Sequence, residues 1–378
     1  MASPKLRFKE FDGKWSLTSL NQLSTKIGDG IHATPKYDEN GIIPFINGNN
    51  LVNGKILINE NTKRISAEEF QKYNQILSDR TLFLSINGTI GNLAFYKNEK
   101  VLLGKSVCFI NLKDDIDDKF VYLLLQSPQL TKTFNSELTG TTIKNLSLAT
   151  VRNSEFYCPS VAEQTKIASF LSAVDEKISL LTKKHELLSQ YKQGMMQKLF
   201  SQQIRFKADD GSEFGEWETL KFKDLINIKY GKDHKKLGDG NIPVLGTGGI
   251  MRYVDSYLYD GESILIGRKG TINKPQFISG KFWTVDTLFY TEIGKKILPK
   301  FAFQQLLLVN WLNLNEATGV PSLNTSSIGN IEIKVPCLDE QTKIANFLSA
   351  IDQKIEVVVK QIEQAKQWKK GLLQQMFV

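Results

Sequence analysis

Cysteine, histidine and long apolar runs are scarce in this sequence, and each scarcity argues against a class of protein. The three cysteines, Cys108, Cys158 and Cys337, lie far apart and form no CxxC pair, which argues against a disulfide framework and a cysteine-based zinc site. The longest apolar stretch, residues 301–312, contains two glutamines and an asparagine and is too short to cross a bilayer. The first ten residues include no apolar stretch typical of a secretory signal. We therefore expect a soluble, cytoplasmic protein.

Length and charge give looser bounds. A chain of 378 residues, 41% of them hydrophobic, is expected to form two or three packed domains. Lys and Arg number 48 against 40 acidic residues, and the net charge of +8 is not concentrated in a basic tail. A mild positive excess is compatible with a polyanionic partner without demonstrating one.

An internal repeat dominates the sequence. The segment PSVAEQTKIASFLSAVDEKI, which begins at Pro159, returns as PCLDEQTKIANFLSAIDQKI from Pro336, an offset of 177 residues. Without a gap, 21 of the 42 positions of residues 159–200 are identical in residues 336–377. Shorter echoes are the openings GKW and GEW, and the loops NGTIGN (residues 87–92) and KGTIN (residues 269–273). The chain therefore contains a duplication and is expected to be pseudo-twofold.

Each copy of the repeat carries a heptad pattern. Apolar residues alternate at spacings of four and three without an internal proline, which predicts a long helix in a coiled coil. Because each chain has two such stripes, we expect them to pair with each other, antiparallel; an amphipathic helix packed on its own domain is the alternative. Lys192 and Lys369 occupy equivalent seam positions, where they either set the register or extend to solvent at the end of the coil, and we favour the second. The seam begins with Ile167, Leu171, Val174 and Ile178 in the first copy and Ile344, Leu348, Ile351 and Ile355 in the second.

The segments outside the helices mix short β-branched or aromatic runs with helical patterns. We expect α+β or α/β domains at residues 1–158 and 205–335, and spacer helices at residues 159–204 and 336–378. The order of the strands does not follow from the sequence. Strands are expected at residues 81–86, 107–112, 263–266, 287–291 and 331–335, and helices at residues 67–77, 120–134 and 299–314.

A search for catalytic signatures finds none that withstands inspection. The GKS at residues 104–106 resembles the end of a P-loop, but Glu99 stands where the first glycine is required. The DPPY or NPPY tetrapeptide of adenine methyltransferases is absent, as is a nuclease pattern of acidic residues and lysine. His32, His185 and His234 lack metal-ligand spacing. We expect no catalytic residue, metal site or cofactor in this chain.

Three loops have compositions suited to DNA. Residues 229–238 concentrate lysines between glycines, and flexible cations suit phosphate contacts. Arg268 in GRKGTINK could pair with guanine through two hydrogen bonds, whereas the corresponding Asn87 would suit adenine. A solvated surface turn is the alternative for each loop. The candidate DNA-binding residues are Asn87, Thr89, Lys232, His234, Lys235, Lys236, Arg268, Lys269 and Thr271.

The duplicated EQTKIA-type motif, each copy followed by a heptad helix, resembles the specificity (S) subunits of type I restriction–modification systems, as do the GKW and GEW openings and the two GTI loops. The resemblance covers essentially the whole chain. It implies a non-catalytic DNA reader whose two target-recognition domains each bind half of a split sequence, held apart by the helices. It also implies two modification (M) subunits, which carry S-adenosylmethionine and methylate adenine N6. Restriction (R) subunits would complete an ATP- and Mg-dependent complex.

The helices expose more apolar surface than one antiparallel pair would bury, notably at Phe170, Phe347 and Trp368, which we expect to help form the M-subunit interface. Two other classes stay open beside the DNA reader. One is a fused DNA-modifying or DNA-cleaving enzyme, which methyl transfer by the purified chain alone would reveal. The other is a coiled-coil adaptor that binds only proteins, which failure to bind DNA would favour.

Overall fold

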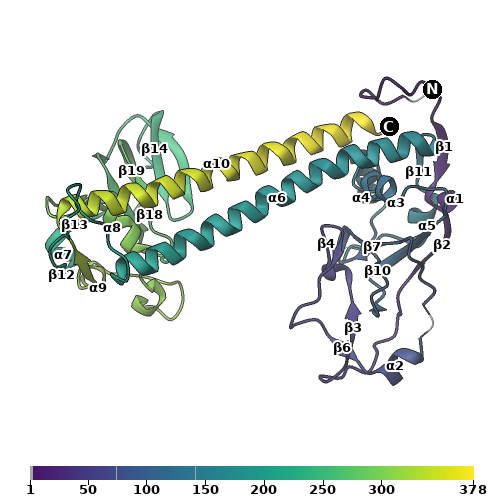
Figure 1. The fold of residues 1–378 in the computed structure, drawn as a ribbon, viewed down its shortest axis with the longest axis horizontal. Coiled ribbons are helices and arrows are strands. Elements are labelled where there is room, and N and C mark those ends of the chain that lie inside the picture. Colours follow the sequence, from purple (N-terminus) through teal and green to yellow (C-terminus); the bar gives the residue numbers. More distant parts are fainter. Residues whose placement is uncertain (1–2, 74, 141) are drawn as a thin grey trace. The chain divides into compact units, whose positions relative to one another are not determined.

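The computed structural model describes residues 3–73, 75–140 and 142–378. The chain forms two compact units. Unit 1 comprises Met1–Leu181 and Gln361–Val378, and unit 2 comprises Thr182–Lys360. Two unbroken helices, α6 (Val161–Phe200) and α10 (Leu338–Met376), each contribute one end to each unit (Figure 1). None of the helices in the described part of the chain is both long and apolar enough to cross a membrane.

Unit 1 is built around a four-stranded antiparallel sheet of order β2-β10-β7-β8. The unit also has three smaller, separate sheets, β1-β11, β4-β5 and β6-β3-β9, and β3 pairs with β9 in parallel. Its elements are β1 (Ser16–Ser19), α1 (Leu20–Leu23), β2 (Ser24–Asp29), β3 (Ile43–Ile46), η1 (Gly48–Asn50), β4 (Leu51–Val52), β5 (Lys55–Ile56), β6 (Arg64–Ile65), α2 (Ala67–Gln71), β7 (Thr81–Asn87), β8 (Thr89–Phe95), β9 (Leu102–Leu103), β10 (Val107–Leu112), α3 (Asp118–Leu124), α4 (Pro128–Ser136), α5 (Leu148–Asn153) and β11 (Glu155–Cys158).

Unit 2 repeats this plan. Its main sheet has the order β13-β20-β17-β18, and a second sheet has the order β15-β14-β19-β16, in which β14 and β19 are parallel. Its elements are β12 (Glu218–Lys221), α7 (Phe222–Leu225), β13 (Ile226–Tyr230), β14 (Asp239–Gly246), β15 (Gly249–Val254), β16 (Tyr259–Asp260), β17 (Ser263–Gly267), β18 (Gln276–Ile278), β19 (Lys281–Thr284), β20 (Leu288–Ile293), α8 (Pro299–Leu306), η2 (Trp311–Leu314), α9 (Thr325–Gly329) and β21 (Glu332–Val335).

The two units share one topology although their sequences differ. In each, the strand after the first short helix is an edge of the main sheet, and the strand before the long helix pairs with the first strand of the unit. A parallel pair, β3–β9 or β14–β19, occurs at the same point of each unit. The duplication therefore includes the globular domains as well as the helices.

All five expected strands are present, as β7, β10, β17, β20 and β21. The expected helix at residues 120–134 was wrong as a single element: it is two helices, because Ser127 caps α4 and Pro128 occupies its first turn. Residues 299–314 likewise divide into α8 and the short η2. The helix expected at residues 67–77 ends at Gln71 as α2, and Asn74 lies outside the described residues.

The ends of the long helices are part of the cores of both units. In unit 1, Ile167, Leu171 and Val174 of α6 share one hydrophobic core with Leu372 and Met376 of α10. In unit 2, Met196 and Leu199 of α6 share a core with the start of α10, namely Ile344, Leu348 and Ile351. The beginning of one helix thus packs beside the end of the other in each unit, so the helices run antiparallel. The helices therefore pair with each other, as expected, and each also packs on its own domain, which was the alternative.

Candidate DNA interface

The lysine-rich loop of unit 2, residues 231–238, connects β13 to β14 and is fixed to the end of β19. The Lys232 N–H donates to the Thr284 carbonyl at 2.8 Å, and the Trp283 indole N–H donates to the Lys232 carbonyl at 2.9 Å. A Cβ on Gly231 would lie 2.0 Å from the Val285 carbonyl oxygen, so only glycine fits there. These backbone contacts hold the loop while the side chains of Lys232, Lys235 and Lys236 stay exposed.

The second candidate loop of unit 2 meets the connection from β19 to β20. The Arg268 N–H donates to the Thr287 carbonyl at 2.8 Å, and its guanidinium donates to the Asp286 carbonyl at 3.1 Å while lying over the Tyr230 ring at 5.4 Å. Lys269 is exposed and Thr271 is half-buried. The structure therefore brings together the two unit 2 loops that composition singled out, on either side of residues 285–287.

A cavity of about 710 Å³ lies between the lysine-rich loop, the turn from β14 to β15 and the connection from β19 to β20. Figure 1 shows the strands β13, β14 and β19 of this unit. His234 is half-buried, and its Nδ1 is a buried atom without a hydrogen-bond partner among the described residues. An unpaired ring nitrogen can donate a hydrogen bond or accept one, depending on the tautomer of the ring. The cavity is lined by Asp233, His234, Lys235, Gly246, Thr247, Gly248, Met251, Val285, Asp286 and Thr287.

The corresponding turn of unit 1 joins β7 to β8. The Asn87 side-chain amide donates to the Asn145 side-chain oxygen at 3.2 Å, so part of its hydrogen-bonding capacity is already used within the protein. Gly88 has φ of +75°, and Gly270 in unit 2 has φ of +88°, backbone conformations that favour glycine. Thr89 is exposed. Of the two unit 1 candidates, Thr89 is thus the more accessible, whereas Asn87 also orders the turn.

A buried cluster that was not predicted above explains the glutamate of the repeated EQ pair. In unit 1, the Arg–Glu–Trp cluster consists of Arg7, Trp15 and Glu163. The Arg7 guanidinium donates two 2.7 Å hydrogen bonds to the Glu163 carboxylate, and the Trp15 indole donates to it at 3.2 Å. Only 1% of Glu163 is exposed. The bond to Glu163 raises the pKa of Arg7.

Unit 2 has the same cluster in Arg205, Trp217 and Glu340. The guanidinium donates to Glu340 at 3.1 and 2.7 Å, and the Trp217 indole donates at 3.0 Å. The adjacent Gln341 ties the start of α10 to the domain, since its amide donates to the Pro336 carbonyl and its oxygen accepts from the Leu298 N–H. The repeated motif therefore fixes each long helix to its domain.

The helix residues predicted to form the spacer and an interface divide into buried and accessible groups. Phe170 packs edge-on against Phe8 at 5.7 Å, and Phe347 packs against Phe206 at 5.7 Å. The chain itself thus covers part of both rings, which are half-buried, while Trp368 is 54% exposed. Their contribution to an interface with a modification subunit stays a prediction. The seam residues Ile167, Leu171, Val174, Ile344, Leu348 and Ile351 are buried, and Ile178 and Ile355 are half-buried.

The seam lysines pair with acids, which corrects their interpretation as side chains extending to solvent. Lys369 lies 2.7 Å from Asp175 in unit 1, and Lys192 lies 2.7 Å from Asp352 in unit 2. These lysine side chains are only 14% and 13% exposed. In an antiparallel pair of helices, facing residues have numbers with a constant sum. The sum is 544 for both ion pairs, so both ends of the coil have the same register.

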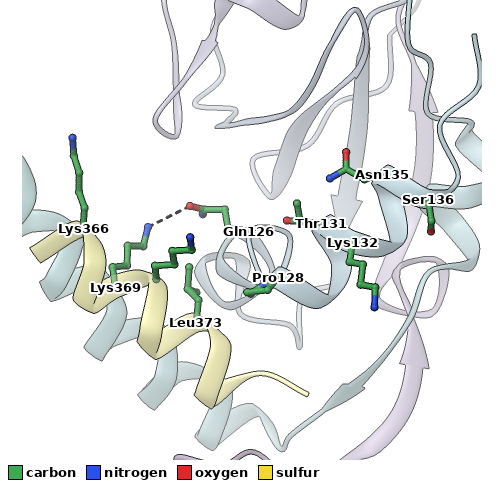
Figure 2. A pocket seen from close by; sticks show the side chains of 10 residues that line it. Gln126, Pro128, Thr131, Lys132, Asn135, Ser136, Lys366, Lys369 and Leu373 are labelled. Carbon is green, nitrogen blue, oxygen red and sulfur yellow. Dashed lines mark hydrogen bonds between the residues drawn. The ribbon is translucent and has the colours of Figure 1, made fainter. Parts of the chain in front are cut away.

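Lys369 also borders a surface groove of unit 1 between α4 and the end of α10. Figure 2 shows its ammonium group directed toward Gln126, to which it donates at 3.3 Å. The groove has a volume of about 800 Å³ and combines apolar stems with lysine ammonium groups. It is lined by Gln126, Pro128, Thr131, Lys132, Asn135, Ser136, Lys366, Lys369, Lys370 and Leu373.

Comparison with known proteins matches this architecture to one family. The family described as "Type I restriction modification DNA specificity domain" matches residues 13–190 and 215–367. The chain is 27% identical to the MjaVIII specificity subunit of Methanocaldococcus jannaschii, over 79% of this chain and 78% of that relative. It is 23% identical to the EcoprrI specificity subunit of Escherichia coli, over 83% and 81% of the two chains.

A solved structure shares the fold. The crystal structure of the S subunit of a type I restriction–modification system from M. genitalium superposes with a TM-score of 0.66 at 20% sequence identity. That match covers 100% of this chain and 99% of the other. With the family matching both halves of the duplication, this chain belongs to the specificity subunits of type I restriction–modification systems.

Proposed function

We propose that each unit of this chain reads one half of a bipartite DNA site. The observation that carries the proposal is one framework, β2-β10-β7-β8 or β13-β20-β17-β18, bearing different side chains on its corresponding turns. Unit 1 has Asn87 before its glycine turn, whereas unit 2 has Arg268 and Lys269. A shared framework with different side chains suits two readers of different sequences.

In unit 2 the exposed cations have separable roles. Lys232, Lys235 and Lys236 contact phosphates, because flexible ammonium groups bind charge without reading bases. Arg268 is held over Tyr230 and reads a base edge. His234 lines the cavity beside the lysine-rich loop and approaches the same duplex.

The long helices set the distance between the half-sites and dock the partners. Domain boundaries at residues 158, 204 and 335 would then separate reader, helix, reader and helix. The exposed Trp368 and the neighbouring lysine-lined groove support a protein-binding surface on unit 1. Two modification subunits with S-adenosylmethionine would methylate the DNA, and in the full complex restriction subunits with ATP and Mg would cleave it. This chain would recognise the target sequence.

Sequencing of N6-methyladenine in DNA from cells expressing this chain with its modification partner tests the proposal. We expect one bipartite motif with a fixed gap, and none when the modification partner is expressed alone. Methylation that is independent of this chain would contradict the proposal.

Exchanging residues 205–335 for the corresponding domain of a related subunit should replace one half-site and leave the other intact. The donor domain must carry an arginine equivalent to Arg205, because Glu340 lies outside the exchanged segment and is fully buried. A reciprocal exchange of residues 1–158 should change only the other half-site. Methylome sequencing of both chimaeras reads the result, and a chimaera altered in both half-sites would show that the units do not read independently.

Changing Lys232, Lys235 and Lys236 together to alanine should weaken binding to all sequences and flatten its salt dependence, since fewer counterions are released. Each lost phosphate contact is expected to reduce the slope of log K against log salt by about 0.9. Fluorescence anisotropy of the assembled complex at several salt concentrations measures this slope.

Arg268→Ala is the matched contrast to the lysine variant. If its contact to guanine is bidentate, the loss should relax specificity at one position, by about 1–3 kcal/mol. An unchanged salt slope in the triple lysine variant would reject the phosphate role, and an unchanged motif in Arg268→Ala would reject the base-reading role.

A further inference from the structure

A second loop packs on the glycine turn of each unit. In unit 1, the Gly88 N–H donates to the Lys144 carbonyl at 2.9 Å, and Asn87 pairs with Asn145 through the backbone. In unit 2, the Gly270 N–H donates to the Pro321 carbonyl at 2.9 Å, and Lys269 pairs with Ser322. We call residues 143–145 and 320–322 the supporting segments of units 1 and 2.

The supporting segments are equivalent in the duplication. Ile143 and Val320 are separated by 177 residues, the same offset that relates Pro159 to Pro336 in the repeated helices. The residue that follows each segment, Leu146 or Leu323, is buried and fixes it to the core. The two segments therefore occupy the same place beside the turns proposed to read DNA.

Each supporting segment presents one apolar β-branched side chain to solvent. Ile143 is 61% exposed and Val320 is 66% exposed. Single exposed apolar residues are ordinary on a protein surface. Here, however, the same kind of side chain recurs at the same position although the two residues that follow it differ, Lys144 and Asn145 in unit 1 against Pro321 and Ser322 in unit 2. A feature retained while its neighbours diverge points to a use that both units share.

Two readers of different half-sites have the sugar–phosphate backbone in common. Contacts to the backbone position a protein on the duplex without carrying sequence information. An aliphatic side chain cannot form a hydrogen bond or an ion pair with a phosphate, but it can pack against the apolar edge of a deoxyribose. We propose that Ile143 and Val320 make this contact, so that the supporting segments position both units on DNA without reading bases. The inference rests on the proposed function of the units.

The test uses Ile143→Ser, Val320→Ser and the double variant, each in the complex assembled with the modification partner. Binding to a duplex that carries the mapped motif is measured by anisotropy across a salt series, and the motif is mapped by methylome sequencing. Because part of one aliphatic side chain loses its buried contact, each single variant should weaken binding about three- to tenfold. The salt slope and both half-sites should stay unchanged, since an apolar contact releases no counterions.

Ile76→Ser is the matched control, because Ile76 is 56% exposed in unit 1. Its carbonyl accepts from Asn111, which pairs with Thr81 at the other end of β7 from Gly88. We expect wild-type affinity for this variant. Binding within twofold of wild type for both Ile143→Ser and Val320→Ser would overturn the inference, as would a changed base in either half-site. If the wild-type complex methylates no bipartite motif, the proposed function itself fails; a mapped motif with unaffected variants refutes the supporting segments alone.

Discussion

Arg205→Ala should destabilise unit 2 by about 3–5 kcal/mol, the usual cost of removing one partner from a buried ion pair. The Glu340 carboxylate would keep only the Trp217 indole as a donor from the Arg–Glu–Trp cluster of unit 2, at 3.0 Å. Glu340 is fully buried, so its carboxylate would lose two charge-assisted hydrogen bonds in a largely desolvated site. Such a loss is a large fraction of the 5–15 kcal/mol that typically stabilises a domain. The change in the free energy of unfolding is measured by urea denaturation, with the unfolding of unit 2 followed by hydrogen exchange of its peptides.

Two further variants separate the buried pair from a surface pair. Arg252 bonds to Asp239 at 3.0 Å, but the aspartate side chain is 98% exposed, so Arg252→Ala should cost no more than about 1 kcal/mol. The double change Arg205→Met with Glu340→Gln should restore part of the lost stability, because no charge is then left buried without a partner. Equal effects of Arg205→Ala and Arg252→Ala would show that the cluster does not hold α10 to its domain.

The Arg–Glu–Trp clusters show where sequence reasoning stops. The repeat identified Glu163 and Glu340 as parts of one motif, and helical periodicity placed both at the start of long helices. Their arginine partners also left a signal, because Arg7 and Arg205 each open the string RFK, at residues 7–9 and 205–207. That string recurs at an offset of 198 residues rather than 177, and Arg205 precedes Glu340 by 135 residues, so nothing in the sequence pairs the arginine with the glutamate. Trp15 and Trp217 were noticed as echoes, and their equivalent spacing from the first strand of each unit was the available signal.

The strands and the loops were predictable to different degrees. Strands such as β10 and β17 are buried on both faces, so their sequences are mostly apolar runs that can be recognised without the structure, interrupted only by Asn111 in β10 and by Ser263 at the start of β17. Strand order was not predictable, since it depends on pairing between distant segments. The meeting of the lysine loop with the turn at Arg268 depends on that order, because both pack on the connection from β19 to β20. The composition of each loop was enough to predict a DNA contact, but only the tertiary structure shows that the two loops lie close together.

The coil register leads to the other prediction with a large expected effect. The pairs Asp175–Lys369 and Lys192–Asp352 have one register, whose midpoint lies between Lys183 and Lys184 in α6 and between Lys360 and Gln361 in α10. Duplicating residues 177–183 in α6 and residues 354–360 in α10 adds one heptad to each helix and repeats the seam residues Ile178 and Ile355. Both ion pairs can still form. Each helix lengthens by about 10 Å.

If the helices set the gap between the half-sites, the double duplication should lengthen it by about two to four base pairs, given a rise of about 3.4 Å per base pair. Both half-sites should remain the same, because neither reader is altered. Methylome sequencing of cells expressing the variant with its modification partner gives gap and half-sites together.

Duplication in α6 alone is the matched control: seven residues would then lack partners in α10, so we expect weaker methylation without a defined longer gap. The original gap in the double variant would mean that the helices hold the units without measuring their separation. Changed half-sites would be more damaging, because the coil would then influence base reading itself.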